Sequence, residues 1–222
     1  EERDRLAEFV LGLERWDGRP VTARLVEVEG CGPVSGHDGE RLSVLCGGLI
    51  RDAGSATQKE ELLPAIAGGE LMLALAHDEP GGRYEIDRVA TTATPTDGGW
   101  QLDGAKVVVL GAPSADKLIV SARDGKGLSL FLVDAKAAGV SMRAYPTQDG
   151  ARAADIKLAK VAVGADALIG TAGNALPAIE RAIDYANAAL CAEAVGIMSA
   201  LNEVTLEYLK TRKQFGVPIG NF

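Results

Sequence analysis

The chain has 222 residues, of which 47% are hydrophobic, with a mean hydropathy of +0.07 and a formal net charge of −8. This composition is typical of a folded globular protein and excludes a disordered one. The acidic balance argues against nucleic acid as a partner, because no basic stripe is present to neutralise phosphates.

Three widely spaced cysteines, Cys31, Cys46 and Cys191, and two histidines form no metal-binding pattern. We therefore expect reduced cysteines, no metal site and a cytoplasmic location. No membrane association is expected, since no apolar run approaches the roughly 20 residues of a membrane span. The charged start, Glu1 to Arg5, is also unlike a signal peptide.

Residues 1–70 are expected to form a helical domain. The first apolar positions recur at helical spacing, at Leu6, Phe9, Val10 and Leu13. After a turn-rich connection over residues 30–39, Ser55 is expected to begin a further helix, because Gln58 three residues on completes a capping box. Gly68 and Gly69 are expected to end that helix.

Residues 71–170 are expected to form a β-domain. Short apolar or β-branched runs are separated by turn residues every 8–12 positions, which favours a barrel or sandwich. Asp97-Gly98-Gly99 is the clearest hairpin signal. The expected strands are 72–76, 89–96, 100–102, 107–110, 118–121, 128–133, 140–143 and 154–158.

Residues 171–222 are expected to begin with one long helix over 174–214, with Asn174 as its N-cap. At 1.5 Å per residue such a helix is about 60 Å long, too long for one small core, so it should pack against other helices, including another subunit's. The chain is therefore predicted to be an α+β multidomain protein: an N-terminal helical domain, a middle β-domain and the start of a C-terminal helical bundle.

The predicted helix ends on Arg212-Lys-Gln-Phe-Gly-Val-Pro-Ile219. Arg212 offers a planar, charged fork suited to a diphosphate, and Phe215 offers an apolar face beside it. Gly216 and Pro218 allow the chain to turn after the helix. The alternative interpretation is an amphipathic helix whose basic last turn complements the helix dipole.

This ending, and the order of helices, β-domain and long helix, resemble the acyl-CoA dehydrogenase family. Four further segments match the family's motifs: Ser55–Glu70, Asp78–Gly82, Trp100–Lys106 and Leu130–Asp134. The resemblance implies FAD as cofactor, an acyl-CoA substrate and an electron-accepting flavoprotein as partner. It also implies that Arg212, Gln214, Phe215 and Gly216 bind the FAD of a neighbouring subunit. We further expect the first domain to be incomplete and the rest of the bundle to lie beyond Phe222.

The same resemblance places other residues at degenerate flavin-ring positions. A family Trp-x-Thr corresponds to Val108, Val109 and Leu110 here, so the aromatic shelf and the hydroxyl donor are lost. A family threonine is replaced by Asp78, whose carboxylate disfavours an electron-rich reduced flavin. The family's Gly-Ser-Asp reads Arg83-Tyr84-Glu85.

No catalytic base is predicted in this chain. One family base position is occupied by Ala186, and the other is expected beyond Phe222. Glu193 is the nearest acid on the long helix, but a partly buried interfacial carboxylate explains it better than catalysis. His77 at a strand end is more often a hydrogen-bonded histidine than a base.

These features lead to three hypotheses. The first is a subunit of an FAD-dependent acyl-CoA dehydrogenase, active in lipid degradation, that completes the FAD site of a paralogous subunit. Such heterotetramers resemble those of actinobacterial steroid catabolism. The second is a self-sufficient dehydrogenase with an atypical flavin pocket, and the third is a non-enzymatic acyl-CoA-binding or scaffold subunit.

Overall fold

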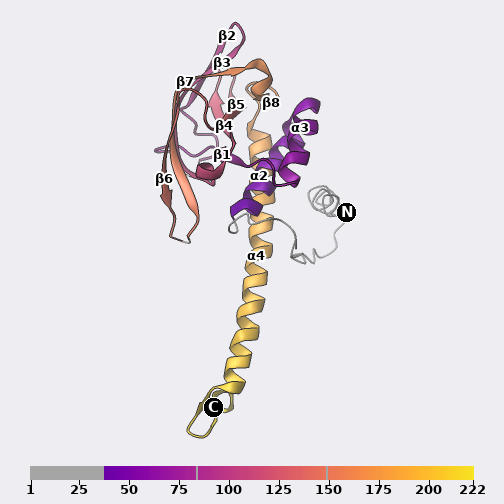
Figure 1. Cartoon of the computed structure of the whole chain (residues 1–222), viewed down its shortest axis with the longest axis vertical. Helices are drawn as coiled ribbons and strands as arrows, with labels where there is room; N and C mark the ends of the chain where they lie inside the picture. The colour runs from indigo at the N-terminus through magenta and orange to yellow at the C-terminus, as the bar shows by residue number, and fades with distance from the viewer. Residues whose placement is uncertain (1–37, 84, 149) are drawn as a thin grey trace.

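The computed structural model describes residues 38–222 except 84 and 149 (Figure 1). The helix expected from the apolar positions between Leu6 and Leu13 lies outside the described residues. The first described helix, α2 (Asp38–Ala53), begins inside the connection expected over residues 30–39. It is followed by α3 (Ala56–Ala67).

The predicted capping box of α3 is confirmed. The Ser55 Oγ accepts a hydrogen bond from the Gln58 backbone N–H at 3.2 Å, and the Gln58 Oε1 accepts one from the Ser55 N–H at 3.0 Å. The Gln58 side-chain amide also donates to the carbonyl oxygens of Asp166 and Leu168. The cap therefore both starts α3 and ties it to the end of the β-domain.

The middle of the chain forms one mixed sheet of eight strands, in the order β6-β7-β3-β2-β4-β5-β8, with β1 paired to β4. Most pairs are antiparallel, but β1 and β2 both run parallel to β4. The strands are β1 (Leu73–Ala76), β2 (Thr92–Thr96), β3 (Gly99–Leu110), β4 (Lys117–Arg123), β5 (Leu128–Asp134), β6 (Val140–Pro146), β7 (Arg152–Gly164) and β8 (Leu168–Ile169). Short 3₁₀ helices span Ala112–Ser114, Ala165–Ala167 and Ile219–Asn221.

The sheet curves around its own core. Trp100 of β3 and Phe131 of β5 lie on strands that are not neighbours, yet their ring centroids are 5.3 Å apart. Alternate residues of β4 point to opposite sides: Leu118 and Val120 join this inner core, whereas Ile119 joins a second core formed with α2, α3 and the start of α4. The predicted β-domain with flanking helices is thus confirmed, and β4 is covered on both faces.

The long helix α4 (Leu176–Thr211) packs on the domain only at its beginning, where Ile179 and Ala182 are buried. Figure 1 shows the rest projecting away from the β-domain to the C-terminus. The Asn174 cap was a wrong prediction: the cap position is Ala175, with no side-chain cap, and the Ala175 N–H donates to the Leu128 carbonyl at 2.8 Å.

The projecting part of α4 exposes a long apolar surface, formed by Leu190, Val195, Ile197, Met198, Leu201, Val204 and Leu206. By length and composition α4 is apolar enough to cross a membrane, and none of its most apolar window is buried. Charged residues such as Glu193 interrupt its apolar stretches, and the absence of membrane association stays a prediction. The same surface is what a helix that packs against other helices needs, and that packing stays a prediction.

Candidate functional site

A β-bulge in β3 shapes the outward face of the sheet. The register with β7 shifts between Lys106 and Val109, and Val108 has a φ of +51°, a conformation that a β-branched residue rarely adopts. As a result Val108 and Leu110 are 52% and 49% exposed, while Val109 is 2% exposed and lies in the inner core. Of the three residues predicted at the flavin ring, only Val108 and Leu110 can contact a ligand with their side chains.

Asp78 lies beside this bulge. It follows β1, its side chain is exposed, and its carbonyl oxygen accepts a hydrogen bond from the Val107 N–H at 2.9 Å. The fold places the backbone of Asp78 against the bulge that exposes Val108 and Leu110, and the resemblance assigned these three residues to one site. We refer to these three residues as the β3 face. Of the neighbouring motif, Tyr84 lies outside the described residues.

A polar group borders the β3 face on the side of β6 and β7. Asp155 accepts hydrogen bonds from Arg143 at 2.6 Å and from the Tyr145 hydroxyl at 2.9 Å, and its Oδ1 lies 3.4 Å from the Val108 backbone nitrogen. The hydrogen bonds from Arg143 and Tyr145 lower the pKa of Asp155. Sequence reasoning missed this group, because its members are distant from Val108 along the chain.

A buried ion pair lies beneath the same face. Lys106 is fully buried, and its ammonium donates to the Glu79 Oε1 at 2.7 Å, the Ser121 Oγ at 2.9 Å and the His77 carbonyl at 3.2 Å. Glu79 also accepts from the N–H groups of Ala90 and Thr91, at 2.6 and 3.0 Å. Glu79 and Lys106 were noticed in sequence only as parts of two separate motifs.

The pKa values of the pair reflect burial and pairing. Burial lowers the pKa of Lys106 to about 8, although the bond to Glu79 opposes this shift. Burial raises the pKa of Glu79, but the hydrogen bonds from Lys106 and Thr91 outweigh it, so the net shift is downward. Both groups are thus charged near neutral pH.

His77 is held by the same group of side chains. Its Nδ1 lies 2.9 Å from the Ser121 Oγ. Burial and the positive charge of Lys106 lower the pKa of His77, so the neutral imidazole is favoured. This environment agrees with a hydrogen-bonded histidine.

The two residues considered on α4 lie in its first half. Ala186 and Glu193 are each half-buried. Ala186 has no group that could take a proton, as expected from the sequence.

The segment after α4 forms a tight hairpin. The strands β9 (Lys213–Gln214) and β10 (Val217–Pro218) pair, and the two residues between them, Phe215 and Gly216, have φ of +51° and +85°. Positive φ at both central positions is the type I′ pattern, for which glycine is favoured and phenylalanine is not. Phe215 is nevertheless 95% exposed.

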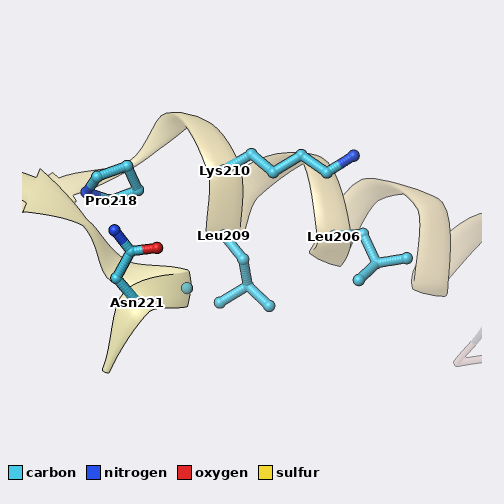
Figure 2. A pocket seen from close by; sticks show the side chains of 6 residues that line it. Leu206, Leu209, Lys210, Pro218 and Asn221 are labelled. Atoms are coloured by element: carbon cyan, nitrogen blue, oxygen red, sulfur yellow. The ribbon is translucent and has the colours of Figure 1, made fainter.

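Contacts to α4 hold the hairpin in place. The Ile219 N–H donates to the Arg212 carbonyl at 2.9 Å, and the ring of Phe222 lies edge-on to Phe215 at 6.3 Å. Figure 2 shows a shallow hollow between the last turns of α4 and the end of the chain, lined by Leu206, Leu209, Lys210, Pro218, Gly220 and Asn221. The hairpin thus presents an exposed arginine and an exposed aromatic ring near a partly apolar hollow.

Comparisons with known proteins agree with this fold. The family described as acyl-CoA dehydrogenase, middle domain, matches residues 74–161. The chain is 30% identical over 214 residues to 3-(aryl)acrylate reductase of Clostridium sporogenes, covering 93% of this chain and 57% of that protein. It is 30% identical over 182 residues to mitochondrial isovaleryl-CoA dehydrogenase of Arabidopsis thaliana, covering 78% and 44%.

The solved structure of PigA with FAD and proline superposes with a TM-score of 0.79 at 29% identity, covering 83% of this chain and 51% of PigA. The chain spans about half the length of the curated relatives it matches. The architecture is therefore that of the acyl-CoA dehydrogenase fold. The match over the middle domain, the dehydrogenases among the relatives and the shared fold all agree with the resemblance to the acyl-CoA dehydrogenase family.

Proposed function

We propose that this chain is a subunit of an FAD-dependent acyl-CoA dehydrogenase that catalyses α,β-desaturation of an acyl-CoA thioester. In this proposal its terminal hairpin completes the FAD site of a neighbouring, paralogous subunit. The observation that carries the proposal is the position of Arg212 and the exposed Phe215 at the far end of α4 from the β-domain (Figure 1). A group held there is more readily shared with another chain than with this chain's own sheet.

The hairpin residues fit the adenosine diphosphate end of FAD. The guanidinium of Arg212 can bind a diphosphate through paired hydrogen bonds, and the ring of Phe215 can pack on a planar base. The β3 face fits the flavin ring less well. Val108 and Leu110 supply apolar contact but no hydroxyl donor, and Asp78 and Asp155 place two carboxylates near it.

Bound FAD would supply the hydride acceptor for the substrate's Cβ, while a carboxylate takes the proton from Cα. Ala186 cannot be that carboxylate, so we assign the base to a residue outside this chain's described part or to the paralogous subunit. The electrons would then pass to an electron-transferring flavoprotein, the type of partner typical of this family. Bulky steroid side-chain CoA esters are the first substrates to test.

The proposal is tested by measuring FAD content and subunit stoichiometry. The chain is purified alone and after co-expression with a paralogous dehydrogenase subunit encoded beside it. We expect a colourless protein alone and a yellow complex with one FAD per pair of unlike chains. A yellow homotetramer with one FAD per chain would contradict the heteromeric assignment and favour a self-sufficient dehydrogenase.

Paired variants separate these two functions. In a heteromer, Arg212→Ala should remove FAD from the complex, whereas Val108→Arg should leave the FAD content unchanged. In a self-sufficient enzyme both variants should lose FAD. Restoring Trp and Thr at Val108 and Leu110 should increase FAD content only if this chain's own ring site is empty.

The non-enzymatic alternative, an acyl-CoA-binding or scaffold subunit, makes a different prediction. The co-purified complex would contain no flavin and would still bind acyl-CoA. Absorbance near the flavin bands, together with an acyl-CoA binding measurement on the same sample, distinguishes it from both dehydrogenase functions.

A further inference from the structure

The buried ion pair connects two segments that are far apart in sequence. Its acidic member, Glu79, lies in the turn after β1, and its basic member, Lys106, lies in β3 just before the bulge. The Glu79 side chain is 5% exposed and the Lys106 side chain 0%. A charged pair so completely removed from water is stabilising only where its hydrogen bonds are satisfied.

Two consecutive residues of β3 bind three consecutive residues of this turn. The Lys106 ammonium donates to the His77 carbonyl and to the Glu79 carboxylate. The Val107 N–H donates to the carbonyl of Asp78, which lies between them. Asp78 is thus held through its own carbonyl and through both neighbours, next to the bulge of β3.

The hydrogen atoms of this group can be fully assigned. An ammonium has three N–H donors, and Lys106 has three acceptors. Because the Ser121 oxygen accepts from Lys106, its own hydrogen is available for the His77 Nδ1 at 2.9 Å. This assignment places the imidazole proton on Nε2 and extends the group from β3 through β4 to His77.

Burial does little to fix the segment that follows Glu79. Between Pro80 and Arg88 every described residue except Gly82 and Ile86 is exposed. The far end is fixed separately, because Arg123 donates to the carbonyl oxygens of Asp87 and Val89. Glu79 closes the span by accepting the N–H groups of Ala90 and Thr91.

We propose that Lys106 is a positioning residue whose ammonium holds the turn His77–Glu79 against β3 and β4 and thereby fixes the position of Asp78 relative to Val108 and Leu110. We call the hydrogen bonds of this ammonium the latch. Replacing the pair by apolar side chains would fill the same space, but it would leave the His77 carbonyl and the Ser121 hydroxyl without this common donor, and the N–H groups of Ala90 and Thr91 without the Glu79 carboxylate. The position of Asp78 would then depend on the single bond to the Val107 N–H. The meaning of this latch for flavin rests on the proposed function, whereas the latch itself rests on the contacts.

The test is amide hydrogen exchange, followed residue by residue by NMR on the full chain without flavin. The amides of Val107, Ala90 and Thr91 report on the latch, because each donates to Asp78 or Glu79. In Lys106→Met we expect their exchange to accelerate at least tenfold relative to amides of β5 and β7. A uniform acceleration across the sheet, or none at these three amides, would overturn the proposal.

Two further variants keep the test decisive. Ser129→Ala is the matched control, since Ser129 is also a buried hydroxyl and donates to Asp124 at 2.7 Å in a different turn; it should leave the three reporter amides unchanged. Ser121→Ala removes one of the three acceptors of Lys106 and should give a smaller acceleration at the same amides. If Lys106→Met does not fold, the Ser121→Ala result decides, and unchanged reporter amides there would overturn the proposal.

Flavin content is then measured for the same variants in the co-expressed complex. A loss of FAD in the latch variants would place flavin at this chain's β3 face, against the heteromeric proposal. Unchanged FAD with accelerated reporter amides would support both the latch and the heteromer. The exchange result therefore decides on the latch whichever way the flavin result falls.

Discussion

Phe215→Gly is expected to affect the chain and its complex in opposite directions. In the free chain Phe215 is 95% exposed and has a φ of +51°. A left-handed conformation costs a non-glycine residue about 1–2 kcal/mol, whereas glycine loses about 0.5–1 kcal/mol through its greater freedom in the unfolded chain. The variant should therefore be as stable as the original chain or more stable by up to about 1.5 kcal/mol.

The complex should respond in the other direction. Burial of a phenylalanine side chain contributes about 1.5–3 kcal/mol, so its loss should weaken FAD binding roughly 10- to 150-fold. The free energy of unfolding of the chain alone is measured by urea titration, and FAD affinity by titration of the flavin-free complex. Phe222→Ala serves as a control, because it removes the edge-on contact of Phe215 without changing the turn.

Two results would refute this reasoning. If Phe215→Gly destabilises the chain alone by more than about 1 kcal/mol, the ring has a structural role that its exposure does not indicate. If FAD affinity is unchanged, the hairpin does not hold the cofactor. In either case the assignment of Arg212 and Phe215 to a neighbour's FAD site would have to be abandoned.

Three other predictions concern the β-domain. Between pH 8 and the ordinary lysine value of 10.5, the unfolded chain binds a proton that folded Lys106 lacks, so the free energy of unfolding should increase with pH. Urea titrations from pH 7 to 10 should show this increase in the original chain and not in Lys106→Met. Parallel pH curves for the two proteins would contradict it. Gly104→Ala should unfold or strongly destabilise the domain, because the added Cβ would lie 2.4 Å from the Thr91 Oγ1 and 2.8 Å from the Thr91 Cα. A melting temperature within a few degrees of that of the original chain would contradict this expectation. Burial and the bond to Asp155 raise the pKa of Tyr145, so Asp155→Asn should lower that pKa in a phenolate absorbance titration, and an unchanged titration would show that the bond is absent in solution.

The features predictable from sequence are those encoded within a few residues. The capping box of Ser55 and Gln58 is one, and the Asp97-Gly98-Gly99 hairpin between β2 and β3 is another. Each needs only the identity of neighbouring residues, because its hydrogen bonds close within one turn. The resemblance to a family supplied the order of the larger units, and the fold confirms that order.

The features that were missed depend on contacts between distant residues. The strand expected over residues 89–96 begins only at Thr92, because the N–H groups of Ala90 and Thr91 are bound by Glu79. Asn174 does not cap α4, because its neighbour Ala175 bonds to Leu128 of β5 instead. No local pattern reveals either partner.

The candidate site shows the same limit. Asp78, Val108 and Leu110 were assigned to one face from the resemblance, and the fold places the backbone of Asp78 against the bulge that exposes the other two. Val109 was assigned with them, but the bulge turns its side chain into the core. The pairing of Lys106 with Glu79 was not foreseen, since the two residues are 27 positions apart and only the fold brings them into contact.

At the proposed ligand-binding positions, two residues other than glycine have a left-handed backbone conformation, Val108 and Phe215. The two differ in the contacts that surround them. Val108 lies in a strand paired with β7, next to an amide bound by Asp78. Phe215 lies in a two-residue turn with its ring in solvent and only Phe222 beside it. A strained residue persists when its surroundings over-determine it, and the surroundings of Val108 are present within the chain. Those of Phe215 are not, and under the proposed function the FAD of a neighbouring subunit would supply the missing contact.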